Sequence, residues 1–571
     1  MTENKTNIPL QILPIGGIEH VTQNMYLYIY GDEILIVDCG IGFPDLQMPG
    51  VDVVIPDITY LLKLLEEGKK IVGMLLTHGH DDHIAALPYL LPQLPDFPIY
   101  GSRLTAGFAM NRLMDGGNTK MIETVTDRQT FSVGQYFKIT PLAMTHSVPD
   151  TKHFLIETPV GNIYHGTDFK LDQAPVDGVL PDYAFMDQLR ERGILLMLTD
   201  CLGVEKPERC GSESSVGEVL REAMKEVKGK CLVTLMSSHI HRIMQVMQVA
   251  HEIGRKVALV GRSVEQNVQT AMELGFLSDD NRVLIDKKEI KNYSDEQLVL
   301  IVAGSQGQEG SSMVRAIYGE HREIQIKPED RVIFSADAIP GNELNYYGAV
   351  DTLCMNNVET IYPAICPGIH QSGHARRPEL AELLERIKPQ KVFPIGGNNR
   401  HRIKYRDLVA KQQGYKNDDV IIPNEGDMIG VYADGRIRKE ANVGLHPQIV
   451  DGLGVGDVGP VVLSDRRALG QAGIIIVLIR KYRDQAQAGK IKVDQFGFAL
   501  QDMTVISRGF VFMKDADDVV DFIKKRTGEL LHQYHQEKRD VCERRIEHGL
   551  SRALYKVIQR EPMIEVEIVD V

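Results

Sequence analysis

Residues 77–83 of this 571-residue chain read THGHDDH, and they end a stretch, residues 71–77, whose apolar composition is typical of a short buried strand. The spacing His-x-His-x-Asp-His places His78, His80, Asp82 and His83 within six positions. Imidazole and carboxylate groups suit a borderline ion such as zinc. A solvated polar loop is the alternative, but four such groups in six positions exceed what packing requires. The loop therefore predicts a metal site at the end of a strand.

Two further candidate ligands follow other predicted strands: His146 in MTHSVPD and Asp168 in YHGTDFK. Taken alone, a single histidine or aspartate in a loop is more often a hydrogen-bonded structural residue. Taken together with the loop, they complete a set of ligands for two ions that share Asp168. Two such ions would hold a hydroxide at neutral pH and clamp the oxygens of an in-line displacement at phosphorus.

The composition limits the classes of protein. A length of 571 residues corresponds to about three or four domains, and 64 Lys and Arg against 78 Asp and Glu give a net charge of −14, so any nucleic acid would need a local basic lining. The N-terminal residues do not resemble a signal peptide, and apolar runs such as 472–479 fall short of the roughly 18 residues of a membrane span. The seven cysteines form no Cys-x-x-Cys pair, which excludes a zinc finger. We expect a cytoplasmic chain with reduced thiols and no membrane association.

The first 200 residues are rich in predicted strands, with hairpins at 25–39 and 153–164. From Ser215 onward helices and strands alternate, which predicts a parallel α/β unit with crossover helices. The predicted helices there are 217–228, 241–253 and 264–274, and the predicted strands are 231–236, 256–260, 297–303 and 331–336. A helix at 379–387 and a strand at 391–395 follow.

A glycine-rich stretch, residues 450–459, predicts a domain boundary. Beyond it, the sequence predicts strands at 473–479 and 505–513 and a charged helical region at 516–558, which together form an accessory domain.

The ligand set resembles the metallo-β-lactamase superfamily. The resemblance assigns His78, His80 and His146 to one metal, Asp82 and His83 to the other, and Asp168 to the bridge between them. Asp38, at the end of an early strand, resembles the aspartate that supports the metal loop by hydrogen bonding.

Over essentially its full length the chain is similar to the ribonuclease J family, which carries an inserted β-CASP domain. The similarity is carried by residues 212–213, 238–242, 261–263, 304–307, 339–343, 368–375 and 450–459. It implies an α/β fold: a metallo-β-lactamase αββα sandwich, an inserted β-CASP parallel α/β domain and a small α+β C-terminal domain. The implied boundaries are 1–212 and 370–449 for the lactamase-like domain, 213–369 for the insertion, and 450–571 for the linker and C-terminal domain.

The resemblance implies a metal-dependent ribonuclease that cuts single-stranded RNA as a 5′-to-3′ exonuclease and as an endonuclease in RNA processing and decay. Zinc is the expected ion, with two ions per chain, and manganese or magnesium are alternatives. Asp82 and His374 are the implied catalytic residues, and the implied substrate-binding residues are Ser238, His241, Arg242, His370, Ser372 and His374. A homodimer or homotetramer is implied, with other RNA-decay factors as partners.

His374 suits a proton donor or transition-state stabiliser because imidazole changes charge near neutral pH. The alternative for His370 and His374 is a helix N-terminal region with incidental histidines. A basic run at 400–406, together with Arg376 and Arg377, either lines an RNA channel or forms a solvated surface.

The chain departs from the family at one metal ligand. The family has a histidine in a Pro-Ile-His-Gly-Glu segment, whereas this chain reads Pro-Ile-Gly-Gly-Asn, with Gly396 at the ligand position. Three outcomes follow: water fills the position, His401 or Asn398 replaces the missing ligand, or a single ion is retained. Losing a direct ligand should cost at least the 10–100-fold in affinity that is typical of outer-shell losses.

Two rival functions remain beside the nuclease. Gly396 favours a catalytically weak RNA-binding or scaffolding subunit. A metallo-β-lactamase-type hydrolase with side activity on β-lactams would use the same metal loop, but it would need neither the insertion nor the phosphate-type donors.

Overall fold

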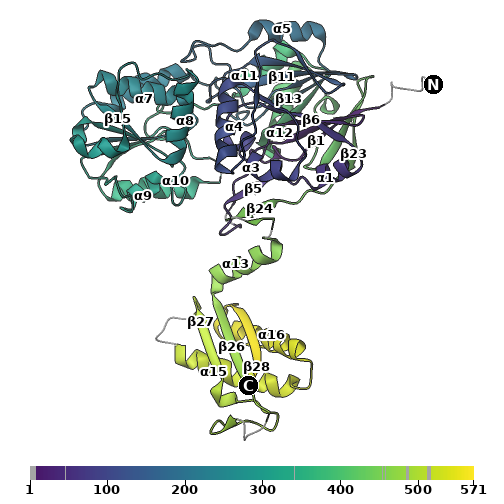
Figure 1. Ribbon diagram of the computed structural model, residues 1–571, viewed down its shortest axis with the longest axis vertical. Helices are drawn as coiled ribbons and strands as arrows, with labels where there is room; N and C mark the ends of the chain where they lie inside the picture. The colour runs from purple at the N-terminus through teal and green to yellow at the C-terminus, as the bar shows by residue number, and fades with distance from the viewer. Residues whose placement is uncertain are drawn as a thin grey trace. The chain divides into compact units, whose positions relative to one another are not determined.

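The computed structural model describes residues 8–45, 47–339, 341–452, 454–456, 458–483, 488–510 and 516–571. The chain divides into two compact units, whose strands and helices are shown in Figure 1. The first unit comprises the residues up to Phe43 together with Val54–Gln448, and the second comprises Pro44–Val53 together with Ile449–Val571.

Two mixed sheets pack face to face in the first unit. The larger has the strand order β23-β22-β1-β3-β4-β6-β7-β8, and the smaller has the order β20-β13-β12-β11-β10-β9. Buried side chains of both sheets, such as Tyr28 and Leu35 of the larger and Phe154 and Ile163 of the smaller, share one core. The strands of the larger sheet are β1 (Leu10–Pro14), β3 (Tyr26–Tyr30), β4 (Glu33–Val37), β6 (Lys70–Leu76), β7 (Ile99–Gly101), β8 (Glu123–Thr124), β22 (Asp427–Val431) and β23 (Ile437–Asn442). Those of the smaller are β9 (Phe131–Val133), β10 (Phe137–Ala143), β11 (Lys152–Thr158), β12 (Gly161–His165), β13 (Leu196–Asp200) and β20 (Lys391–Ile395).

Helices cover the outer faces of this sandwich. A second core joins the smaller sheet to α5 and α11, with Tyr164, Leu189 and Leu383 among its members. The helices of the sandwich are α1 (Thr59–Glu66), α2 (Asp81–Ile84), α3 (Leu87–Leu90), α4 (Arg103–Asp115), α5 (Tyr183–Arg192), α11 (Arg377–Ile387) and α12 (Asn399–Tyr405). The predicted αββα sandwich is therefore confirmed.

A third sheet, with the strand order β16-β15-β17-β14-β18-β19, forms the inserted domain, and all of its strand pairs are parallel. Its strands are β14 (Cys231–Thr234), β15 (Lys256–Val260), β16 (Leu284–Ile285), β17 (Leu298–Val302), β18 (Arg331–Phe334) and β19 (Glu359–Ile361). Its helices are α6 (Val216–Met224), α7 (Ile240–Glu252), α8 (Arg262–Glu273), α9 (Ser312–Ile317) and α10 (Glu343–Met355). The five residues of β17 are all buried, as expected of a central strand in a parallel sheet covered on both faces. The helix and strand alternation read from the sequence is confirmed.

The second unit has a three-stranded sheet in the order β27-β26-β28, in which β26 pairs antiparallel with β27 and parallel with β28. Its larger elements are α13 (Pro460–Ala472), β26 (Ile474–Lys481), β27 (Thr504–Arg508), α15 (Ala516–Tyr534), α16 (Arg539–Ile558) and β28 (Met563–Asp570). Apolar residues of α15 and α16, such as Ile523 and Ile546, pack on Ile475 and Val566 of the sheet. The small α+β C-terminal domain is confirmed.

The structure refines several predicted elements of this unit. The helical region 516–558 consists of two helices, and β27 ends at Arg508, whereas the predicted strand continued to residues 511–513, which lie outside the described residues. The glycine-rich stretch contains β24 (Gln448–Asp451) and β25 (Gly454–Val455), and its residues 453 and 457 also lie outside the description, as does residue 340 of the segment 339–343. Among the described residues, no helix is both long and apolar enough to span a bilayer.

Candidate active site

The candidate site lies where parallel strands of the sandwich end. In the larger sheet β4 and β6 run parallel, and their carboxyl ends lead to Asp38 and to the loop 77–83. In the smaller sheet β12, β13 and β20 run parallel and lead to Asp168, Asp200 and Gly396. Because the carboxyl ends of parallel strands meet at one edge of a sheet, polar residues far apart in sequence come together there.

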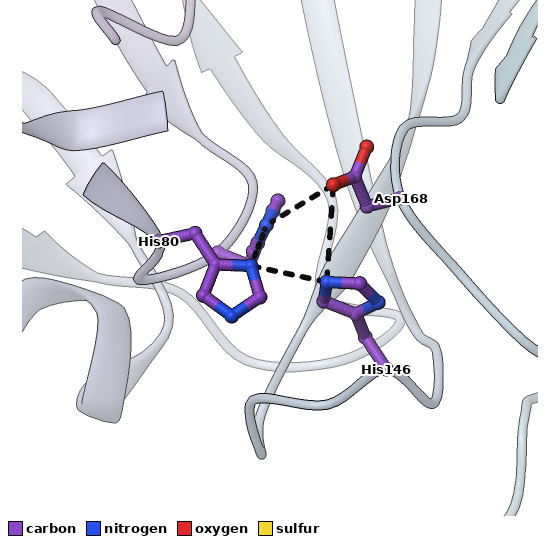
Figure 2. A group of neighbouring side chains, drawn as sticks. His80, His146 and Asp168 are labelled. Atoms are coloured by element: carbon purple, nitrogen blue, oxygen red, sulfur yellow. Dashed lines mark hydrogen bonds and ion pairs between the residues drawn. The ribbon is translucent and has the colours of Figure 1, made fainter. Parts of the chain in front are cut away.

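Four ring or carboxylate atoms form the first donor group. His80 Nδ1 lies 3.0 Å from His78 Nε2 and 3.1 Å from His146 Nε2. The Asp168 Oδ2 atom lies 3.7 Å from His78 Nε2 and 3.8 Å from His146 Nε2. Figure 2 shows His80, His146 and Asp168 pointing toward a common centre. Donors at about 2.0–2.1 Å from a tetrahedral ion lie about 3.3 Å apart, so the group fits a divalent metal.

Outer contacts orient the rings of this group. The Nδ1–H of His146 donates to the carbonyl of Gly373 at 2.7 Å, which leaves the Nε2 lone pair facing the centre. Burial lowers the pKa of His80 to about 3 and the pKa of His146 well below its ordinary value. Both rings are therefore neutral, as metal ligands must be.

The second donor group consists of Asp82, His83 and Asp168. The Nε2 atom of His83 lies 3.6 Å from Asp82 Oδ2 and 3.6 Å from Asp168 Oδ2. The other ring nitrogen, Nδ1, donates to Asp38 Oδ2 at 2.8 Å, and Asp38 Oδ1 also accepts from the backbone N–H of Thr77 at 2.8 Å. One fully buried carboxylate thus fixes both the start of the metal loop and the orientation of His83.

His374 lies beside Asp168 but takes its orientation from Asp200, a residue that the sequence analysis missed. Its Nδ1–H donates to Asp200 Oδ2 at 2.9 Å, and its Nε2 lies 3.8 Å from Asp168 Oδ2. Burial alone would lower the pKa of His374, but Asp200 and Asp168 outweigh it and raise the pKa to about 9. Asp200 and Asp168 therefore favour the protonated form of His374, in which its Nε2–H can donate a proton.

Arg242 of the inserted domain is fully buried and commits its guanidinium to protein partners. It donates to both carboxylate oxygens of Glu213 at 2.9 and 2.7 Å and to the carbonyls of Ser335 and Gln371 at 2.8 and 3.3 Å. It also donates to His370 Nδ1 at 2.6 Å. An arginine cannot accept a hydrogen bond, so Nδ1 of His370 is unprotonated and the neutral ring carries its proton on Nε2. Burial and the charge of Arg242 hold the pKa of His370 well below its ordinary value.

The other predicted substrate-binding residues have different surroundings. The Oγ atom of Ser372 accepts from the backbone N–H of His374 at 3.1 Å. The Nε2 atom of His241 lies 3.2 Å from Asp177 Oδ2, and Ser238 is buried just before α7. Arg242 of α7 thus contacts His370, and Ser372 and His374 lie on the same segment as His370. His241 instead contacts Asp177.

The basic run 400–406 does not form a continuous cationic lining. Arg402 is fully buried and donates to the carbonyls of Pro394 and Pro423 at 3.3 and 2.5 Å. Arg406 pairs with Asp407, and Arg400 lies 3.5 Å from Glu205. The expectation of either an RNA channel or a solvated surface is therefore wrong for Arg402, which has a structural position.

Known families match the same regions of the chain. The matching descriptions are the metallo-beta-lactamase superfamily (residues 19–171), the ribonuclease J beta-CASP domain (228–353), the Zn-dependent metallo-hydrolase RNA specificity domain (368–423) and the ribonuclease J C-terminal domain (461–571). The chain is 34% identical to Ribonuclease J of Thermus thermophilus over 569 residues, which cover 97% of this chain and 94% of that protein. This chain belongs to the ribonuclease J family.

Other similarities agree with this assignment. Ribonuclease J of Synechocystis is 32% identical over 99% of this chain and 87% of its own length, and Ribonuclease J2 of Bacillus subtilis is 29% identical over 98% and 99%. A crystal structure of a protein of unknown function from Enterococcus faecalis shares the fold, with a TM-score of 0.50 and 16% identity over 74% of this chain and all of that chain. As a ribonuclease J, the chain is a metal-dependent hydrolase, and its donor groups fit a divalent metal.

Gly396 lies beside Asp168, the carboxylate that both donor groups share. A Cβ atom placed on Gly396 would lie 3.7 Å from Asp168 Oδ1 and 3.5 Å from Asp200 Oδ1, so a longer side chain there would reach the second donor group. The residue has φ of +65°, a backbone conformation that favours glycine.

Neither predicted substitute for the ligand at residue 396 is placed among the donor groups by the structure. His401 points its Nε2 toward Glu205 Oε2 at 3.5 Å, and Asn398 is the N-cap of α12. The second group therefore has three donors among the described residues.

Three residues of the site escaped the sequence analysis: Asn24, Asp200 and Glu213 in its role as a partner of Arg242. The Nδ2 of Asn24 lies 3.1 Å from His83 Nε2, at the second donor group. Asp200 had a usable signal, because it is an aspartate at the carboxyl end of the apolar strand LMLTD. Asn24 offered none, since an isolated asparagine before a strand is common.

Replacing Asp38 by asparagine tests the support of the second donor group. Asparagine tolerates the left-handed conformation of residue 38 (φ of +61°) and preserves its shape, but it removes the charge that His83 Nδ1–H meets. We expect metal affinity at the second donor group, which contains His83, to fall about 10–100-fold, as for other outer-shell changes. Calorimetric titration of the metal-free protein measures this, with Asp32→Asn at an exposed turn as the control. Unchanged affinity would contradict the role of Asp38.

Replacing Arg242 by lysine tests the fixed tautomer of His370. Lysine keeps the charge near Glu213 but cannot hold His370 and Gln371 at the same time, because it lacks the planar fork. In protein with ¹⁵N-labelled histidine, we expect a single Nε2–H tautomer of His370 in the wild type and a mixture in Arg242→Lys. Arg221→Lys, which alters the exposed pair with Glu252, is the matched control. A proton on Nδ1 in the wild type would refute the assignment.

Proposed function

We propose that this chain hydrolyses phosphodiester bonds of single-stranded RNA in RNA processing and decay, as a 5′-to-3′ exonuclease and as an endonuclease. The observation that carries the proposal is the convergence of two metal-donor groups on Asp168 with a protonated imidazole, His374, beside them. Membership of the ribonuclease J family and the match to an RNA specificity domain support RNA as the substrate.

The first donor group, His78, His80, His146 and Asp168, would hold one ion, and the second, Asp82, His83 and Asp168, would hold another more weakly. Three imidazoles and a carboxylate favour zinc, with manganese or magnesium as alternatives. A divalent ion bound there polarises phosphoryl oxygens and lowers the pKa of water.

The chain's own residues move the protons. Asp82 is the proposed acceptor of the proton from the attacking water, through the carboxylate of the second donor group. His374, held by Asp200 at 2.9 Å, donates its Nε2 proton to the leaving oxygen. Asp200 thereby acts as a positioning residue for His374.

Two residues of the same segment bind the phosphate. The Nε2–H of His370 and the hydroxyl of Ser372 supply hydrogen-bond donors to phosphate oxygens. Ser238 and His241 are proposed as further contacts from the inserted domain, and Arg242 contributes through His370 because its own donors are occupied.

A second function, a catalytically weak RNA-binding subunit of a decay complex, is favoured by one observation. Gly396 leaves the second donor group with three described donors. Under this alternative the chain binds RNA and its decay partners while another subunit cleaves.

The domain boundaries, the cellular location and the oligomeric state of the chain are proposed as follows. The lactamase-like domain comprises residues 1–212 and 370–449, the insertion 213–369, and the C-terminal part 450–571. The chain works in the cytoplasm, and it assembles as a homodimer or homotetramer.

Cleavage of a 5′-monophosphorylated single-stranded RNA tests the nuclease directly. We expect the wild type to cut the RNA and His80→Ala to lose at least about 100-fold in rate, because one ligand of the complete group is gone. His548→Ala, in α16 of the other unit, is the control and should retain activity. Cleavage by His80→Ala at the wild-type rate would refute a metal-dependent mechanism at this site.

Elemental analysis of metal per chain, with Gly396→His, separates the two functions. We expect the variant to hold more metal than the wild type, because an imidazole at residue 396 adds a fourth donor beside Asp168. If the wild type cuts RNA, the nuclease function stands and catalysis does not need a side-chain ligand at residue 396. If the wild type is inert and Gly396→His gains both metal and activity, the scaffolding function replaces the nuclease.

Light scattering at micromolar concentration tests the assembly. We expect the mass of two or four chains of 63.9 kDa each. The mass of one chain would contradict the proposed oligomer.

A further inference from the structure

A cavity of about 320 Å³ opens beside His370 on the side of the inserted domain. Its wall includes Asp337, which follows β18, Tyr347 of α10 and Tyr362, which follows β19. Gly368 and His370 complete the wall from the segment that leads to His374. The cavity therefore adjoins the segment that carries the proposed phosphate donors, and neither donor group of the metal site includes any of its residues.

The aromatic wall is rigid at its base and exposed at its rim. Tyr346 is 1% exposed, and its hydroxyl donates to the carbonyl of Ala336 at 3.0 Å. The Tyr347 ring stands edge-to-face on Tyr346 with centroids 5.1 Å apart, and it is 45% exposed. Tyr362 lies 6.4 Å from Tyr347, again edge-to-face. Tyr347 thus offers a supported aromatic face to a flat ligand, as nucleobase-binding proteins do.

Asp337 supplies an available acceptor at the same cavity. Its side chain is 65% exposed, and its nearest recorded partner among the described residues, His370 Nε2, lies 3.9 Å away, beyond hydrogen-bond distance. Both carboxylate oxygens can therefore accept from a ligand. A carboxylate accepts two parallel hydrogen bonds from a ligand edge that presents two adjacent N–H donors.

His370 links this acceptor to the phosphate donors. Since Arg242 occupies Nδ1 of His370, the ring directs an Nε2–H donor to the side of the cavity. Ser372 and His374 continue along the same segment toward Asp168. The donors of His370, Ser372 and His374 thus suit an anion, whereas Asp337 and Tyr347 in the cavity suit a flat ring with N–H donors.

We propose that this cavity binds the base of the first, 5′-terminal nucleotide of the RNA and prefers guanine. Guanine presents N1–H and N2–H side by side on its Watson–Crick edge and can bond both oxygens of Asp337 while it stacks on Tyr347. Adenine, cytosine and uracil each present a single donor group on that edge. This inference rests on the proposed function for its substrate class, but it concerns residues outside the metal site.

Calorimetric binding of the four nucleoside 5′-monophosphates to the full metal-loaded protein tests the preference. We expect GMP to bind at least about tenfold more tightly than AMP, CMP or UMP, as for other paired base contacts. Asp337→Asn should abolish the preference, because an amide offers one acceptor and one donor. Asp351→Asn, at an exposed acid of the same helix as Tyr347, is the control and should retain it.

Two variants of Tyr347 test the stacking of the base on its ring. Tyr347→Ala should weaken all four nucleotides by roughly tenfold, because stacking does not depend on the base. Tyr347→Phe should bind as the wild type does, which separates loss of the ring from loss of the hydroxyl. Metal content should be unchanged in every variant of Asp337 and Tyr347, which shows that each still folds.

Equal binding of the four nucleotides, or a guanine preference that survives Asp337→Asn, would overturn the inference. RNA cleavage is scored separately, with substrates that differ only in their first nucleotide. If RNA is cut equally whatever the first base and GMP has no advantage, the base site fails and the nuclease stands. If no RNA is cut but GMP is preferred through Asp337, the nuclease fails and the base site stands.

Discussion

The carboxylate of Asp168 lies within 4 Å of four imidazole nitrogens, those of His78, His83, His146 and His374. Burial alone would raise its pKa, but His374 and His83 outweigh burial and hold the pKa well below its ordinary value. A buried charge of this kind is costly unless cations and donors surround it. The imidazoles around Asp168 come from the loops that follow β6 and β10 and from the segment that precedes α11.

The inserted domain is tied to this site by a second buried charge. Glu213, at the point where the chain enters the insertion, pairs with Arg242, and Arg242 reaches His370 at the point where the chain returns. Lys170, near Asp168 in sequence, lies 3.9 Å from Glu213 Oε2. The tautomer of His370 therefore depends on contacts within a domain that supplies no metal ligand. These contacts link α7 of the inserted domain to the segment that carries His370, Ser372 and His374.

The sequence was most informative where the chemistry is local. The metal loop 77–83 holds four donors in one short segment, so spacing alone revealed it, and the alternation of β14 to β18 with helices revealed the parallel sheet. The positions of His146 and Asp168 after predicted strands completed the candidate ligand set, and resemblance to the family then assigned the ligands to two metals and placed His374 beside the phosphate. Asn24 remained hidden because only the folded sheets bring it to His83, whereas Asp200 ends the apolar strand β13 and was missed although that position is a usable signal. The burial of Arg402 was hidden for a related reason, since its partners are backbone carbonyls that have no sequence signature.

Gly396 offers no side-chain donor to the second donor group and leaves the charge of that group unchanged. The ligand that the family resemblance implies at this position is a neutral imidazole, so its loss leaves the carboxylates of Asp82 and Asp168 in place. The long-range attraction of the group for a cation is therefore retained, while the number of described protein donors is three. Four-coordinate zinc would then need a donor from outside the protein, such as water or a phosphate oxygen of the substrate. Because the first donor group has four candidate ligands among the described residues, the glycine at residue 396 concerns the second donor group alone.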